Sequence, residues 1–138
     1  MTTGYSGTPL PCKLGIRPGS RVLLVAAPSG FTLEAPDATV HARPGRDPYD
    51  VIVVFCPDGA ALRSRFAHLA GRLTPAGALW VCWPKRASRV PTDLSENAVR
   101  DHGLAAGLVD VKVAAIDATW SGLKFVRRLA DRQAGPST

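Results

Sequence analysis

Three short apolar runs constrain the fold of this chain more than any other feature. They cover residues 21–27, 50–56 and 78–83, and each is nearly free of polar side chains. A strand that alternates apolar and polar residues covers one face of a sheet, whereas a continuous apolar run is typical of a strand buried on both faces. The three runs therefore predict the central strands of a sheet that has helices on both sides.

The segments between these runs predict helices and weaker strands. Residues 58–72 predict a helix with Asp58 as its N-cap, because apolar side chains recur there at helical spacing. Asp93 and Glu96 form a capping-box-like start for a second helix that ends near residue 104. We also expect a short helix near residues 9–14, a weak strand at 38–42 and a turn at 74–77, where Pro75 and Gly77 stand.

The end of the chain predicts two strands, at residues 108–116 and 123–128. About six residues separate them, which permits only an antiparallel hairpin, whereas the earlier strands alternate with helices and so predict right-handed parallel crossovers. The expected fold class is α/β: a three-layer, Rossmann-like, mostly parallel sheet that ends in an antiparallel hairpin. We expect one domain over residues 1–138, with an N-terminal arm at 1–20 and a frayed tail at 133–138.

This strand order resembles that of the class I methyltransferases, and the stretches that carry the resemblance are residues 19–25, 48–54 and 73–80 together with the closing hairpin. A second resemblance, over nearly the whole chain, is to the small bacterial family known as domain of unknown function 3052. It rests on residues 4–7, 13–16, 83–85, 92–94, 107–112 and 120–124. The first resemblance implies a methyltransferase-like fold; the second implies kinship without an activity.

The methyltransferase-like fold usually binds S-adenosylmethionine (SAM) with a glycine-rich turn after the first strand and an acidic residue after the second. Here residues 26–31 hold one glycine and a proline, and His41 and Arg43 stand at the end of the second expected strand. Asp37 lies at the other end of that strand. We therefore expect no cofactor and regard SAM as unlikely; an NADP phosphate on Arg43 is a weaker alternative.

Known catalytic patterns are missing from the sequence. His41, His68 and His102 are far apart and have no metal-ligand spacing, so no metal is expected. Cys56 and Cys82 end two apolar runs and could meet as a redox pair if their strands are neighbours, although a buried cysteine usually serves as a small apolar side chain. Cys12 is expected to be the more exposed thiol. The absence of a catalytic motif favours a binding protein over an enzyme.

Ligands of open α/β sheets bind at the carboxyl ends of the parallel strands. Residues 28–33, 84–91 and 117–122 should all lie at that edge and bring cations, hydroxyls and an indole together. Such a group suits a phosphate or carboxylate, although the same residues could instead serve only to cap helices and cover the core. The candidate ligand-binding residues are Lys85, Arg86, Ser88, Thr92, Asp93, Asp117, Trp120, Ser121 and Lys124.

Charge and composition leave several partners open. The 17 basic and 11 acidic side chains give a net charge of +6, but the basic residues are spread along the chain without a run of five. Nucleic acid is therefore possible without being favoured. No apolar run approaches the roughly 18–20 residues of a membrane helix, and the N-terminus lacks a secretory apolar region. Three cysteines give no disulfide framework, so a reduced, cytoplasmic location is expected.

The sequence thus favours a non-catalytic binding or regulatory module on a degenerate methyltransferase-like scaffold, which recognises an anionic ligand or a protein partner at the carboxyl edge of the sheet. One alternative is a SAM-dependent methyltransferase with an atypical pocket. The other is a basic protein associated with nucleic acid. The sequence does not fix an oligomeric state.

Overall fold

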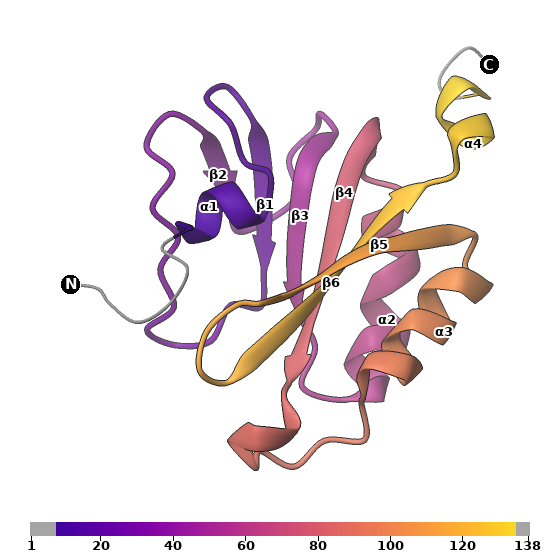
Figure 1. Ribbon diagram of the computed structural model, residues 1–138. Helices are drawn as coiled ribbons and strands as arrows, with labels where there is room; N and C mark the ends of the chain where they lie inside the picture. Colours follow the sequence, from indigo (N-terminus) through magenta and orange to yellow (C-terminus); the bar gives the residue numbers. More distant parts are fainter. Residues whose placement is uncertain (1–7, 135–138) are drawn as a thin grey trace.

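The computed structural model describes residues 8–134, which form one six-stranded sheet with helices along the chain. Figure 1 shows the arrangement. The elements in chain order are α1 (Leu10–Lys13), β1 (Arg21–Val25), β2 (Thr39–His41), β3 (Tyr49–Phe55), α2 (Gly59–Ala70), β4 (Leu73–Pro84), the 3-10 helix η1 (Arg86–Ser88), α3 (Glu96–Ala105), β5 (Leu108–Ala115), β6 (Trp120–Arg127) and α4 (Leu129–Ala134).

The strands follow the order β2-β1-β3-β4-β6-β5. Strands β2, β1, β3 and β4 pair in parallel, whereas β6 is antiparallel to both β4 and β5. The expected mostly parallel sheet with a closing antiparallel hairpin is therefore confirmed. The hairpin is longer than expected, because β6 begins at Trp120 rather than at Leu123.

Two apolar cores lie on opposite faces of the sheet. On one face, α2 and α3 cover the sheet with Leu62, Phe66 and Val99, which pack against side chains of β3, β4 and β6. On the other face, the segment around α1 supplies Leu14 and Ile16 to a smaller cluster. The central strands are buried on both sides, as the apolar runs predict.

Two local expectations are wrong. Residues 74–77 belong to β4 instead of forming a turn; the pairing with β3 is irregular there, between Tyr49 and Val51, and this irregularity accommodates Pro75 and Gly77 in a strand. Asp93 does not cap α3, because the side chain of Ser95 accepts the hydrogen bond from the N–H of Ala98.

The two ends of the chain are described only in part. Helix α4 follows β6 directly and was not expected from the sequence; it includes residues 133–134 of the predicted frayed tail. Residues 1–7 of the predicted N-terminal arm and residues 135–138 of the tail lie outside the described residues.

The contact between α3 and β6 depends on a residue without a side chain. Gly103 lies against the buried ring of Phe125, and a Cβ at Gly103 would overlap that ring.

Gly103→Ala should therefore destabilise the protein by about 1–3 kcal/mol through overpacking, although the same change at an unobstructed helix position is stabilising. Urea unfolding measures the difference. Gly71→Ala is the control, since its Cβ would have 3.5 Å of clearance from the nearest atom, the carbonyl oxygen of His68; equal stability of both variants would contradict the packing argument.

Candidate functional site

The connections of the sheet reverse direction between β1 and β3. From β1 the chain continues to β2 on one side, and from β3 it continues to β4 on the other. Val25 is paired with Val54, so the segments that follow these two strands leave the sheet side by side. In open α/β sheets this reversal, at the carboxyl ends of the strands, is where ligands bind. We call residues 26–31 and 56–58 the switch-point site.

The loop after β1 exposes its backbone at the switch-point site. Ala26 directly follows the strand and has a φ of +59°, and Gly30 has a φ of +86°. Left-handed backbone is uncommon for a residue with a side chain and costs of order 1 kcal/mol or more, which is why such residues concentrate at functional sites. No heavy atom lies within 4 Å of the place where a Cβ of Gly30 would stand. The turn thus adopts at Ala26 a conformation for which glycine is the usual residue.

A row of aromatic rings borders the loop. The ring of Phe31 packs edge-on against Phe55 at 4.9 Å between centroids, and Phe55 packs in the same manner against Trp120 at 5.1 Å. Phe55 is buried, whereas Phe31 and Trp120 are half-buried. These rings come from the loop after β1, from β3 and from β6, so they join the switch-point site to the hairpin.

The turn from β3 into α2 supplies the polar groups of the site. The exposed carboxylate of Asp58 caps α2 by accepting a hydrogen bond from the N–H of Ala61 at 2.9 Å. Arg65 reaches back from α2 and donates to the carbonyl oxygen of Phe55 at 2.6 Å. This arrangement places a carboxylate and a held arginine at the carboxyl end of β3.

The connection from β4 to α3 is tied to the same turn. The Thr92 hydroxyl donates to the carbonyl oxygen of Pro57 at 2.7 Å, and the Asp93 carboxylate accepts from the N–H of Gly59 at 2.8 Å. These two predicted site residues therefore lie beside the switch-point site. Their hydrogen bonds fix the connection from β4 to α3 against the start of α2.

A basic pocket of about 490 Å³ opens at the carboxyl end of β4. Lys85, Arg86 and Arg89 line it, and none of them forms an ion pair within residues 8–134. Arg89 has a left-handed backbone with a φ of +62°. The structure also places Thr92, Ser95, Glu96 and Ser121 in the lining of this pocket.

The nine predicted ligand-binding residues divide into groups. Lys85, Arg86, Thr92 and Ser121 line the basic pocket. The other five do not line it. The Ser88 hydroxyl donates to the carbonyl oxygen of Lys85, the Asp93 carboxylate accepts from the N–H of Gly59, and the Asp117 carboxylate accepts from the N–H groups of Thr119 and Trp120. Trp120 packs on Phe55, and Lys124 is paired with Trp80 in the middle of the sheet.

Lys124 therefore does not reach the predicted edge. The sequence placed it there because the hairpin was expected to begin at Leu123; β6 in fact begins at Trp120, so Lys124 lies further along the strand. Arg89 and Ser95 were missed, although the density of basic residues from 85 to 89 was a signal for Arg89. The left-handed conformation of Ala26 had no signal in the sequence.

Cys56 and Cys82 lie on adjacent strands, with the N–H of Cys56 donating to the carbonyl oxygen of Cys82 at 2.8 Å. Both are free thiols and both are buried. Burial raises the pKa of Cys56 to about 11 and raises the pKa of Cys82 well above its ordinary range, where the neighbouring Cys56 adds to the effect. A raised pKa keeps a thiol protonated and unreactive, which argues against the redox pair.

Within the described part of the chain, no group of three or more His, Cys, Asp and Glu side chains is placed to hold a metal ion. His41, at the end of β2, has its Nδ1 2.6 Å from the hydroxyl oxygen of Tyr49. None of the helices between residues 8 and 134 has the length and apolar character that a membrane span needs.

Comparison with solved structures identifies the fold. The magnesium protoporphyrin IX methyltransferase of Synechocystis PCC 6803 with bound SAM has a TM-score of 0.56 and 13% identity, and the match covers 80% of this chain and 71% of that one. A fibrillarin pre-rRNA processing protein of Methanococcus jannaschii gives 0.54 and 13%, over 90% and 70%. A putative methyltransferase from Thermoplasma acidophilum gives 0.52 and 12%, over 94% and 77%.

The fold is that of the class I methyltransferases. No family model and no curated protein matches the chain. The resemblance to domain of unknown function 3052 therefore stays a prediction.

The same comparison corrects two expectations. The favoured non-catalytic binding or regulatory module is wrong, and so is the view that SAM is unlikely, because the similar structures include a methyltransferase with bound SAM and with its demethylated product SAH, and a putative methyltransferase. The expectation against SAM rested on the single glycine after the first strand and on the missing acidic residue after the second. The structure shows that Ala26 adopts the left-handed backbone without being a glycine.

The thiols provide a test of the described site. At pH 7.5 a thiol-alkylating reagent should modify exposed Cys12 completely while Cys56 and Cys82 remain unmodified, because the two buried thiols are protonated and shielded from the reagent. Mass spectrometry of peptides after timed alkylation measures this. Modification of Cys56 or Cys82 at the rate of Cys12 would show that the strand ends are open and reactive.

Proposed function

We propose that this protein is a SAM-dependent methyltransferase that holds its cofactor at the switch-point site. The observation that carries the proposal is the left-handed backbone at Ala26 and Gly30, directly after β1, which opens the turn to close approach by a ligand. The similar solved structures that hold SAM and SAH support a cofactor of this kind.

The residues at the site fit the chemistry of this cofactor. The exposed residues Ala26, Ala27, Ser29 and Gly30 offer backbone N–H and carbonyl groups. The Asp58 carboxylate can accept hydrogen bonds from amino or hydroxyl groups. Phe31 offers a half-buried aromatic surface for an apolar ring or a cation. When bound, SAM supplies a methyl group on a positively charged sulfur, ready for transfer to a nucleophilic atom. The end of β2 contributes no carboxylate, because His41, Ala42 and Arg43 stand there.

The acceptor that fits the neighbouring basic pocket carries phosphate groups. Lys85, Arg86 and Arg89 form no ion pair with any described residue, and Thr92 connects this pocket to the turn that bears Asp58. Unpaired cations favour a polyanion, and the net charge of +6 would attract one over the whole surface. We therefore propose RNA as the acceptor. The match to a fibrillarin pre-rRNA processing protein supports this choice.

Two further expectations remain proposals. We propose that the chain acts in a reducing, cytoplasmic environment, which its free thiols support. We also propose kinship with domain of unknown function 3052, on the motifs given above.

Calorimetric titration tests the cofactor. SAM and SAH should both bind saturably. Asp58→Asn retains the cap of α2, since asparagine caps as well as aspartate, but removes the charge; the Kd for SAM should rise about tenfold, the effect of about 1.4 kcal/mol from a charged hydrogen bond. Asp101→Asn, an exposed change on α3, is the matched control and should leave the Kd unchanged. Binding of neither compound would contradict the proposed function.

Transfer of tritium from labelled SAM to bulk ribosomal RNA tests the acceptor. Lys85→Ala and Arg86→Ala should each lower kcat/KM for RNA about tenfold while the Kd for SAM stays constant, because they remove phosphate contacts outside the cofactor site. Arg46→Ala, in the exposed connection from β2 to β3, is the control for lost charge. Equal losses in all three variants would show that only overall charge matters; absence of label in RNA would reject this acceptor and leave the cofactor proposal to the calorimetry.

A further inference from the structure

One half of the sheet has an uncovered face. Helices α2 and α3 both lie on the same side, and on the other side the segment around α1 and residues 31–38 cover β1 and β3. Within residues 8–134, no helix lies across β4, β6 and β5 on that second side; α4 stands beyond the end of β6 (Figure 1). Val111 of β5 is 54% exposed there. Antiparallel strands such as β6 and β5 can leave one face open to solvent, so this face can receive a partner.

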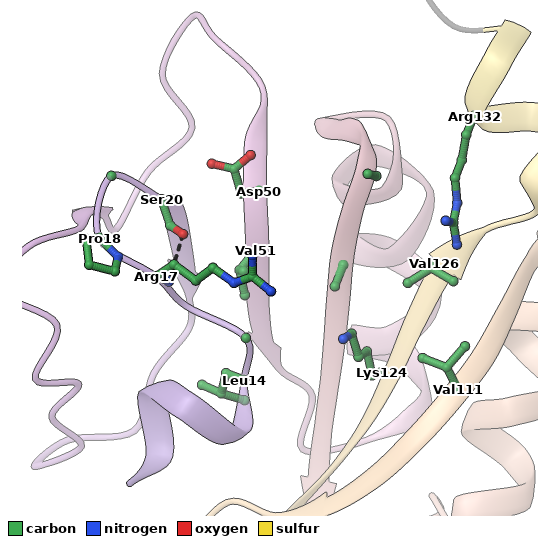
Figure 2. A pocket seen from close by; sticks show the side chains of 14 residues that line it. Leu14, Arg17, Pro18, Ser20, Asp50, Val51, Val111, Lys124, Val126 and Arg132 are labelled. Atoms are coloured by element: carbon green, nitrogen blue, oxygen red, sulfur yellow. Dashed lines mark hydrogen bonds between the residues drawn. The ribbon is translucent and has the colours of Figure 1, made fainter.

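A trough of about 750 Å³ marks this uncovered half. We define it by its apolar floor (Val51, Ala78, Val111 and Val126) and its cations (Arg17, Lys124 and Arg132). Figure 2 shows Arg17 on one side of the trough and Lys124 and Arg132 on the other, with their charged ends directed inward. The trough therefore combines an apolar strip with positive charge on both flanks.

Within residues 8–134, no ion pair neutralises the cations of the trough. Lys124 lies directly opposite Lys112 in the β5–β6 pairing, and burial together with Lys112 lowers the pKa of Lys124. Facing lysines repel each other, and neither lysine forms an ion pair among the described residues. One carboxylate, that of Asp50, lines the trough, and its Oδ2 accepts from the N–H of Arg21. An added negative charge would relieve this repulsion.

We propose that the trough is the docking site for an acidic, amphipathic α-helix of a partner protein. Such a helix presents an apolar stripe with carboxylates on both sides of it, which matches the valine floor and the cations on the two flanks. A second copy of this chain does not fit, because a symmetric contact would place Arg17, Lys124 and Arg132 against the same cations.

The trough is distant from the proposed catalytic edge. Its lining includes Ser20, before β1, and Asp50, at the start of β3, so it lies toward the amino ends of the strands that carry the switch-point site at their carboxyl ends. A partner in the trough would leave that site open. The docking proposal therefore does not depend on the proposed function.

A designed peptide tests this proposal on the full chain. The probe is a fluorescent helical peptide of about 14 residues, roughly 21 Å long, with leucines on one face and glutamates along both sides of that face. Fluorescence anisotropy should show saturable binding. Lys124→Glu and Val111→Glu should each weaken it about tenfold or more, because they repel the glutamates and interrupt the apolar floor.

Matched controls distinguish docking in the trough from nonspecific electrostatic and hydrophobic binding. Val113→Glu changes a valine of the same strand that is paired with Leu123, on the face that α3 covers. Arg63→Glu reverses an exposed charge on α2, on the opposite face of the sheet. Both should retain binding. A peptide with glutamine in place of each glutamate should bind about tenfold more weakly than the probe.

Three results would overturn the proposal: no binding of the acidic peptide, equal binding of the glutamine peptide, or equal loss in the control variants. Thermal melting of each variant confirms that it is folded; Val111 is exposed, so Val111→Glu decides the outcome even if Lys124→Glu unfolds the protein. Neither readout uses methyl transfer, so failure of the proposed function would leave this test intact.

Discussion

The parallel pairing of β3 with β4 is the contact on which the rest of the structure depends. Val51 to Phe55 are at most 3% exposed, and they align with the buried segment from Ala78 to Cys82. Both apolar cores are built from the two faces of these strands. The Trp80 indole N–H also donates to the carbonyl oxygen of Leu14 at 3.1 Å, which anchors the segment around α1 to β4. The ends of β1 and β3 are therefore held rigidly, as a binding site at a sheet edge requires.

Much of this fold follows from the sequence because short continuous apolar runs rich in β-branched residues are typical of strands covered on both faces. The same reasoning located α2, with Asp58 at its N-cap, and the antiparallel hairpin. It failed at residues 74–77, where Pro75 and Gly77 indicated a turn but the irregular pairing of β4 with β3 accepts them in a strand. Local residue preferences cannot reveal such tertiary compensation.

From the sequence, only those site residues could be predicted that directly follow the carboxyl end of a strand. The rule that ligands bind at carboxyl edges pointed to Lys85 and Arg86, and both line the basic pocket. It misplaced Lys124, because that position depends on where β6 begins. The left-handed backbone of Ala26 could not be predicted from the sequence, because the surrounding structure imposes this conformation on an alanine. The expectation about SAM therefore rested on the number of glycines in this turn and on the missing acidic residue after the second strand, and not on the backbone of Ala26.

The two edges of the sheet have different proposed roles: cofactor and acceptor bind at the carboxyl ends of the strands, and a partner helix docks toward the amino ends. The central claim is that SAM binds beside Ala26 and Asp58. Backbone amide NMR of the labelled protein, titrated with SAH, tests this claim most directly. We expect saturable shifts concentrated in residues 25–31 and 56–59. Absence of shifts, or shifts confined to the trough or the basic pocket, would contradict it.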